Sequence, residues 1–158
     1  MTMQALPQRE GDRPDTGPAV PHVQFTQTSP KAVREQLRQW MSTEFPDTVT
    51  GPSEISDPGA FAVFLDGHAP AKGAVLLPPR LTAEFAHVHV DGSLHLALSP
   101  EDQKKLLARG WGEPHPLYSA EINVVMLYAP RTVEELDVAR TVLEASYRYA
   151  TGHDRVAV

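Results

Sequence analysis

The stretch AHVHVDGSLHLAL, residues 86–98, decides the fold expected for this chain of 158 residues. The dipeptide Asp-Gly at 91–92 is a strong turn signal between two runs of alternating side chains, so we expect a β-hairpin with strands over 84–90 and 93–98. Four of the seven histidines lie in or just after this hairpin: His87, His89, His95 and His115. Because histidine titrates near neutral pH and is the commonest metal ligand, we expect the chemistry of the protein here.

The length of the turn decides which side chains share a face of the hairpin. A two-residue loop would mix His with Leu or Val on each face. In a three-residue loop over 90–92, Gly92 supplies the left-handed residue and His87 lies opposite His95. Only this register separates polarity, and a slip of one residue would move each strand's apolar set to the wrong face. We therefore predict the three-residue loop, with one face formed by Phe85, His87, His89, Ser93, His95 and Ala97.

Three interpretations of this histidine face stay open. Directly opposed residues have Cβ atoms about 5 Å apart, and same-face neighbours along a strand are about 6.6 Å apart. Protonated imidazoles at such distances repel one another, so we expect lowered pKa values. The face is a solvated surface, a site where His87, His89 and His95 hold a divalent metal, or a metal-free substrate pocket in which His acts as base and hydrogen-bond donor.

The rest of the chain alternates between helical and strand patterns. Ser29 with Pro30 and Thr132 with Glu135 have the spacing of helix N-termini. The expected elements are a helix over 29–45, strands over 61–65, 74–77 and 122–128, and helices over 99–110 and 132–152. This order predicts an α+β fold, an antiparallel sheet with three helices packed mainly on one face.

Length and composition bound the domain count and the partners. We expect one α+β domain over residues 25–158, preceded by a disordered or loosely draped Pro-rich arm over residues 1–24. A net charge of −6 argues against a nucleic-acid partner. The absence of cysteine excludes disulfides, zinc–cysteine sites and thiol nucleophiles. With no secretory signal and no long apolar stretch, we expect a cytoplasmic location, no membrane partner and a small-molecule substrate; no oligomeric state is predicted.

Further candidates flank the hairpin. Trp111 between two glycines is either a platform for a flat ring or a plug at the end of the core. The prolines beside His115 fix its backbone, which suits a residue that faces a ligand. Arg131 opens the last helix, where a cation opposes the dipole and needs an anion, either substrate or Glu. Glu84 or Glu113 is the candidate carboxylate that orients an imidazole. We expect His22, His68 and His153 at the surface, and substrate contacts from Phe85, Ser93, Trp111 and Tyr128.

The chain from His87 to Gly152 resembles a known family. The motifs that carry the resemblance are His-Val-His at 87–89, Ser-Leu-His-Leu-Ala-Leu at 93–98, Arg-Gly-Trp-Gly at 109–112, His-Pro-Leu at 115–117, Leu-Tyr-Ala-Pro-Arg at 127–131 and Glu-Ala-Ser at 144–146. Together they are similar to the C-terminal part of fungal luciferase and to bacterial proteins with the same domain. The resemblance covers a little under half of the chain.

The resemblance implies an activity. Fungal luciferase oxidises a hydroxylated styrylpyrone with molecular oxygen, and no organic cofactor is known to be needed. By this resemblance His87, His89, His95 and His115 surround a phenol or enol, and one of them acts as general base. Arg131 or a second imidazolium then stabilises the oxyanion. We expect an oxygenase of bacterial secondary metabolism; the rivals are a non-oxidative cyclase or isomerase that uses the same histidines and a non-catalytic ligand-binding domain.

Overall fold

The computed structural model describes residues 3–119 and 121–154, which form one antiparallel sheet with three helices. The sheet order is β1-β2-β3-β4-β6-β5. The elements, in chain order, are α1 (Lys31–Thr43), β1 (Thr48–Pro52), β2 (Phe61–Leu65), β3 (Glu84–Val88), β4 (Leu94–Leu96), α2 (Pro100–Ala108), β5 (Gly112–Pro114), β6 (Val125–Leu127) and α3 (Val133–Thr151). The structure confirms the predicted α+β class.

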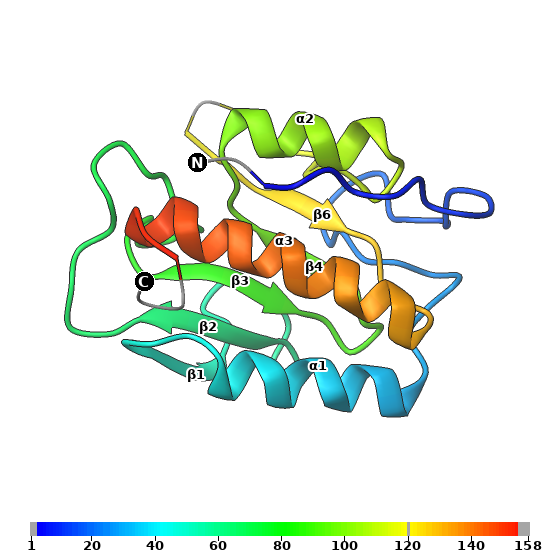
Figure 1. Cartoon of the computed structure of the whole chain (residues 1–158), viewed down its shortest axis with the longest axis horizontal. Coiled ribbons are helices and arrows are strands. Elements are labelled where there is room, and N and C mark those ends of the chain that lie inside the picture. The colour runs from blue at the N-terminus through cyan, green and yellow to red at the C-terminus, as the bar shows by residue number, and fades with distance from the viewer. Residues whose placement is uncertain (1–2, 120, 155–158) are drawn as a thin grey trace.

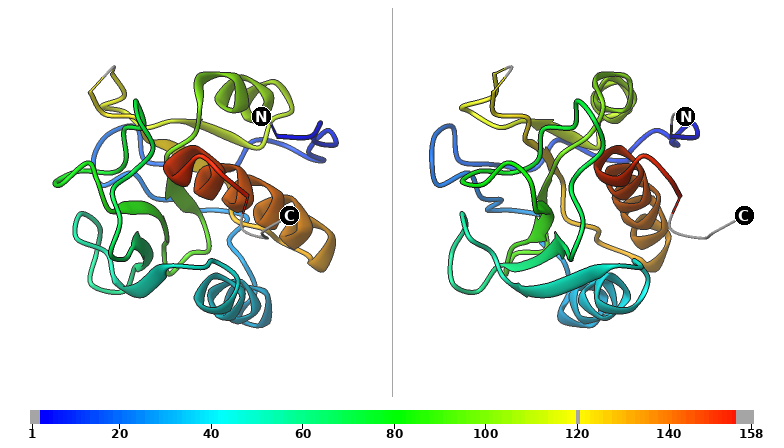
Figure 2. Two further views of the ribbon diagram at one scale, coloured as in Figure 1. Left: turned by 60° about the vertical axis from the view of Figure 1, so that its left-hand side comes forward. Right: turned by 90° about the vertical axis from the view of Figure 1, so that its left-hand side faces the viewer.

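The helices lie mainly on one side of the sheet (Figures 1 and 2). The long helix α3 packs on β3, α1 packs beside α3 and the first two strands, and α2 packs against β5. Ser146 of α3 is fully buried, and its Oγ donates to the carbonyl oxygens of Phe85 and Ala97 at 3.2 and 2.6 Å. The apolar core therefore fills the layer between sheet and helices, and the opposite face of the sheet is left for the histidines.

The hairpin has the predicted three-residue loop. His87 pairs with His95, and Val88 pairs with Leu94. The His89 N–H donates to the Ser93 carbonyl at 2.8 Å, and the Gly92 N–H donates to the His89 carbonyl at 2.9 Å. Gly92 has φ +98°, which is the left-handed conformation that the turn requires. This register places His87, His89 and His95 on one face of the sheet.

A bulge in β3 corrects the prediction for Phe85. Val63 of β2 pairs with Ala86 and Phe64 pairs with Glu84, so Phe85 is an extra residue in the strand. The alternation of side chains reverses there, and the Phe85 ring packs in the core against Phe45, with ring centroids 5.7 Å apart. The expectation that Phe85 lies on the histidine face is therefore wrong. Ala97, expected on the same face, also belongs to the core cluster.

The first segment of the chain is not a loose arm. Met3 and Leu6 are buried in the core, and the Met3 N–H donates to Asp102 Oδ1 of α2 at 2.7 Å. The Arg9 N–H donates to the carbonyl of Arg109 at 3.0 Å. The segment then reaches the histidine face of the sheet, where His22 contacts His95 and is only 3% exposed. The expected disordered arm is therefore wrong for residues 3–24; residues 1 and 2 lie outside the described part.

Two local predictions also need correction, and two strands were not predicted. Ser29 does not cap α1, because its Oγ donates to the Pro130 carbonyl at 2.5 Å and Pro30 occupies the N-cap position. Residues 74–77 form no strand, although their backbone is tied to the start of β3 by the bond from Leu77 N–H to the Glu84 carbonyl. The short edge strands β1 and β5 had no predicted counterpart. In contrast, Thr132 caps α3 as predicted.

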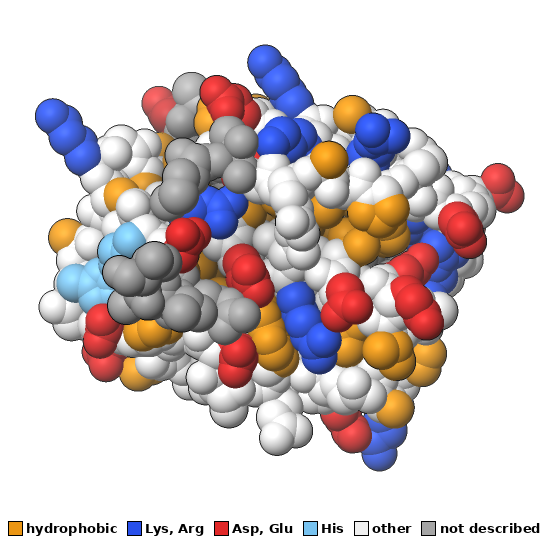
Figure 3. Space-filling view, in the orientation of Figure 1, with side chains coloured by type: hydrophobic (Ala, Val, Ile, Leu, Met, Phe, Trp, Pro, Cys, Tyr) orange, Lys and Arg blue, Asp and Glu red, His pale blue; other side chains and the backbone are white. Residues whose placement is uncertain are grey.

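No helix within residues 3–119 and 121–154 is long and apolar enough to cross a membrane. On the face that Figure 3 shows, acidic and basic side chains are interspersed over the helices. That face therefore carries no large area of a single charge.

We predict that Gly92→Ala destabilises the fold. A Cβ at this position would collide with the Ser29 side chain, and the positive φ is strained for alanine. The free energy of unfolding should fall by about 1–3 kcal/mol, measured by denaturant titration. Gly51→Ala in the edge strand β1 is the control, because nothing lies within 4 Å of its added Cβ. Equal effects of the two substitutions would contradict the assigned turn.

Candidate functional site

A cavity of about 370 Å³ lies against the histidine face of the β3–β4 hairpin. Five histidines from three parts of the chain line it: His22, His87, His89, His95 and His115. Its remaining wall is mainly apolar, formed by Val20, Pro21, Val23, Ile55, Leu77, Pro78, Leu117, Ile122 and Val124, together with Ser56 and Asp57. The volume suits a small organic molecule, and a mostly apolar wall with a few convergent polar groups is typical of such sites.

Three imidazoles of the hairpin meet at one point. His87 Nε2 lies 3.2 Å from His89 Nε2 and 3.3 Å from His95 Nδ1. All three side chains are buried, with exposures of 2–5%. The three nitrogens lie within 4.8 Å of one another and form the first of two groups of described residues with a geometry that suits a metal ion. We call His87, His89 and His95 the hairpin triad.

The outward nitrogen of each triad ring is held by a partner. His87 Nδ1 lies 2.7 Å from Glu84 Oε2. His89 Nδ1 lies 2.9 Å from Ser93 Oγ, which donates to Asp91 Oδ1 at 2.5 Å. These contacts fix the orientation of both rings, and a carboxylate stands behind each of them.

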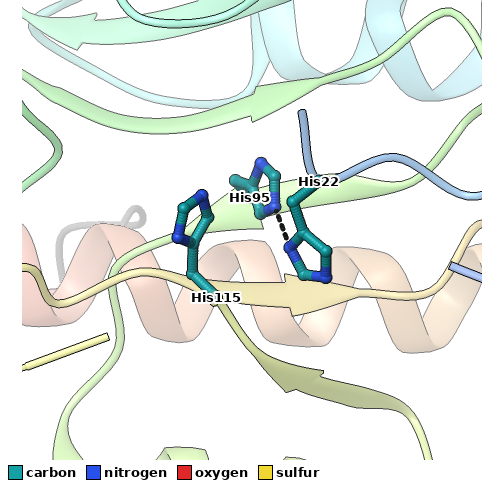
Figure 4. A group of neighbouring side chains, drawn as sticks. All are labelled: His22, His95 and His115. Atoms are coloured by element: carbon teal, nitrogen blue, oxygen red, sulfur yellow. Dashed lines mark hydrogen bonds between the residues drawn. The ribbon is translucent and has the colours of Figure 1, made fainter. Parts of the chain in front are cut away.

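The third triad ring is held through His22. His95 Nε2 lies 2.8 Å from His22 Nδ1, and His22 Nε2 lies 2.8 Å from Glu113 Oε2. Figure 4 shows His22, His95 and His115 around a common space, with His22 and His95 in contact. The ring centroids of His95 and His115 are 5.1 Å apart. Both candidate orienting carboxylates, Glu84 and Glu113, therefore contact an imidazole.

Burial keeps three histidines of the cavity neutral, namely His89, His95 and His115. It lowers the pKa of His89 to about 3, and the nearby His87 adds to the shift. Burial is the main cause that holds the pKa of His95 well below its usual value, and the nearby His89 and His87 lower it further. Burial, with a smaller contribution from His22, lowers the pKa of His115 to about 4. At neutral pH these three imidazoles each carry one ring proton and one lone pair, in line with the expected lowering.

The Glu113 carboxylate joins the first segment of the chain to the site. Burial alone would raise its pKa, but hydrogen bonds from His22, Tyr128 and Thr16 outweigh burial and lower it. Arg13 also donates to Glu113, at 2.5 Å. The carboxylate is therefore charged at neutral pH and accepts a hydrogen bond from the His22 ring.

The other predicted site residues lie outside the cavity. Arg131 is 2.5 Å from Glu135 Oε2, so a glutamate supplies the anion that it needs. Trp111 is buried and donates from Nε1 to the Pro7 carbonyl at 2.6 Å. Of the two alternatives, it therefore closes the end of the core and is not a platform for a ligand ring. Tyr128 donates to Glu113 at 2.9 Å. Burial, with a smaller contribution from Glu113, raises the pKa of this phenol to about 12. Ser93 reaches the site only through His89.

Sequence reasoning missed His22. It was expected at the surface, yet it is buried between His95 and Glu113, 73 and 91 positions along the chain. The Pro-rich segment has no periodic pattern, so the only signal in the sequence that it packs is its scattered apolar residues, such as Met3 and Leu6. His68 and His153 are exposed, as expected.

The fold and the cavity define a small-molecule site built on an antiparallel sheet, and comparison with known proteins gives its family. Residues 82–146 match the family model of the Luciferase domain. The chain is 32% identical to the luciferase of Armillaria gallica and 34% identical to that of Neonothopanus nambi. Each match covers 92% of this chain and 61% of the relative. Residues 82–146 therefore form a luciferase-like domain, and the chain as a whole is similar to these fungal luciferases.

The comparisons also mark the limits of the likeness. The chain spans 61% of the length of the curated relatives it matches. These relatives come from fungi, so the matches do not support the expected bacterial setting. No solved structure matches.

We predict that acid destabilises the fold through the buried imidazoles. Because their folded pKa values lie below the unfolded value of about 6.5, the unfolded chain binds more protons, and stability falls as the pH drops below that value. In metal-free buffer, His89→Gln should reduce the slope of unfolding free energy between pH 6 and 5 by about 1 kcal/mol per pH unit.

Denaturant titrations at each pH measure this slope. His68→Gln is the matched control, because His68 is exposed and should leave the slope unchanged. A slope that His89→Gln does not alter would show that His89 is protonated in the folded protein.

Proposed function

We propose that this chain is an oxygen-dependent oxidoreductase that acts on a small aromatic molecule with an enol or phenol hydroxyl, such as a hydroxypyrone. The observation that carries the proposal is the meeting of buried, oriented imidazoles in the wall of a largely apolar cavity. The fungal luciferases that the chain resembles support the choice of reaction class.

The wall of the cavity favours a flat, apolar substrate. Val20, Ile55 and Leu117 line it and are themselves 47–60% exposed, so apolar surface is open to solvent at its mouth. Covering this surface with an aromatic ring would be favourable by about 25 cal/mol for each Å² removed from water. The substrate therefore lies with its ring among these side chains and its hydroxyl toward the histidines.

The proposed reaction adds one oxygen molecule to the substrate. The hydroxyl first gives its proton to His87 Nε2, on the ring whose other nitrogen contacts Glu84, and becomes an enolate or phenolate. This anion transfers one electron to O₂, which gives a substrate radical and superoxide. The two combine through a new carbon–oxygen bond, and the resulting peroxide anion takes the proton back from His87. The net change is substrate plus O₂ to hydroperoxide, so no external reductant is consumed.

His115 supplies a hydrogen bond to the substrate in this proposal. Its Nδ1 accepts the Leu117 N–H at 3.0 Å, so in the neutral ring the proton is on Nε2. A neutral donor at the wall of the cavity stabilises a developing oxyanion. Arg131 has no part in the proposal, since Glu135 holds it away from the cavity.

Oxygen uptake with a hydroxylated styrylpyrone tests the proposal. We expect one O₂ consumed per substrate, and His87→Ala should lower the rate at least about 100-fold, as expected when an acid–base group is lost. His68→Ala, at an exposed position, should retain the rate. The O-methylated substrate should not react, because it has no hydroxyl proton to lose.

Two results would overturn this function. Turnover without oxygen uptake would indicate a cyclase or isomerase. Tight binding of styrylpyrones and of simpler hydroxypyrones, with no turnover of either, would indicate a binding domain.

A further inference from the structure

The hydrogen bonds of the cluster fix the tautomer of each triad ring. Glu84 accepts from the backbone N–H of Glu54 at 3.0 Å and from Ser53 Oγ at 2.8 Å, so its carboxylate is an acceptor. His87 Nδ1, 2.7 Å from the same carboxylate, therefore carries the ring proton. The other nitrogen of His87, Nε2, presents a lone pair to the cavity.

The same reasoning applies to His89. The single hydroxyl proton of Ser93 goes to Asp91, which accepts it at 2.5 Å. Ser93 Oγ then accepts from His89 Nδ1 at 2.9 Å, so that nitrogen carries the proton. His89 Nε2 presents a lone pair, 3.2 Å from the lone pair of His87.

His95 follows through a relay. Glu113 accepts from His22 Nε2, which leaves Nδ1 of a neutral His22 ring as an acceptor. His95 Nε2, 2.8 Å away, donates to it, so the proton of His95 is on Nε2. The remaining nitrogen, His95 Nδ1, points a third lone pair at His87, 3.3 Å away.

Three converging lone pairs repel one another unless a positive charge lies between them. A single added proton would join only one pair of nitrogens, whereas a metal ion accepts all three lone pairs. We propose that His87 Nε2, His89 Nε2 and His95 Nδ1 hold a divalent first-row transition-metal ion. This inference rests on the proposed function and changes one step of it: with their lone pairs on the ion, the triad imidazoles no longer take the substrate proton, and the ion would favour its loss by stabilising the substrate anion.

The spacing fits metal coordination. Two nitrogens bound at 2.0–2.1 Å in a tetrahedral site are about 3.3 Å apart, and the observed separations from His87 Nε2 are 3.2 and 3.3 Å. Neutral imidazoles suit divalent zinc, iron, copper and nickel. Three protein ligands leave further coordination positions open, as in catalytic sites. Because all three residues line the cavity, those positions face the substrate.

The surrounding carboxylates support the same assignment. The N–H of each ligand ring points toward a carboxylate. His87 donates directly to Glu84, His89 reaches Asp91 through Ser93, and His95 reaches Glu113 through His22. This outer shell is the usual arrangement behind metal-bound histidine. Glu84 is only 2% exposed, and its donors are a hydroxyl, a backbone amide and an imidazole. An ion on His87 would supply the positive charge that such a buried carboxylate needs.

A second geometric group, His22, His95 and His115, fits less well. His22 Nδ1 and His95 Nε2 are 2.8 Å apart, the length of a hydrogen bond and shorter than two ligands of one ion require. The other nitrogen of His22 is bound to Glu113. We therefore assign His22 to the outer shell and His115 to the substrate.

Cobalt(II) titration tests the inference in the full chain after removal of bound metal with a chelator. The absorption of the ion should change with a stoichiometry of one per chain. His89→Ala should weaken binding at least about 100-fold, and Glu84→Gln about 10–100-fold, the usual effect of an outer-shell change. His115→Ala should change affinity less than about threefold, and so should His68→Ala at an exposed position.

X-ray absorption of the cobalt-loaded wild type gives a readout that needs no variant. We expect three imidazole nitrogens in the first shell, at about 2.0–2.1 Å. Failure of the folded wild-type chain to bind cobalt saturably would overturn the inference. Loss of binding in His115→Ala with retention in His89→Ala would also overturn it, by moving the ion to the second group.

The titration is done without substrate or oxygen, so it separates the two proposals. Cobalt binding without oxygen uptake by the metal-loaded protein would contradict the proposed function and leave the metal site standing. Oxygen uptake by a chain that binds no metal would contradict the metal site and leave the proposed function standing.

Discussion

The pairing of His87 with His95 across the β3–β4 hairpin is the constraint on which the site depends. It requires a three-residue loop, and the loop requires the left-handed backbone of Gly92. A two-residue loop would separate the imidazoles onto both faces. Within the observed register, the core takes Val88, Leu94 and Leu96 on one side while three imidazoles gather on the other. One turn thus orders both the core and the candidate chemistry.

Alternating polarity made this hairpin predictable from sequence, because only one register separates the apolar from the polar side chains. Helix capping likewise located α3, where the Thr132 side chain accepts from the backbone N–H of Glu135. The bulge at Phe85 was not predictable, since an extra residue in a strand leaves no mark on composition. Strands β1 and β5 were missed because short edge strands rich in Gly and Pro have the composition of loops.

The candidate site was predicted where its residues are close in sequence and missed where they are distant. His87, His89 and His95 meet through one hairpin, so local geometry was enough. His22 and Glu113 complete the network only because the first segment of the chain crosses the sheet, which tertiary packing decides. Arg131 and Trp111 are neighbours of the site in sequence but not in space, so their unusual positions in the chain were misleading. The catalytic roles of the histidines stay predictions.

The positions of the ring protons are the central claim, and nitrogen-15 NMR of the histidine side chains measures them directly. At pH 7.5 the two-bond and three-bond nitrogen–proton correlations should show His87 and His89 as Nδ1–H tautomers and His95 as the Nε2–H tautomer. All three lone pairs then face the cavity, whether or not an ion is bound. A proton on His87 Nε2, or imidazolium signals from the hairpin triad, would contradict the account.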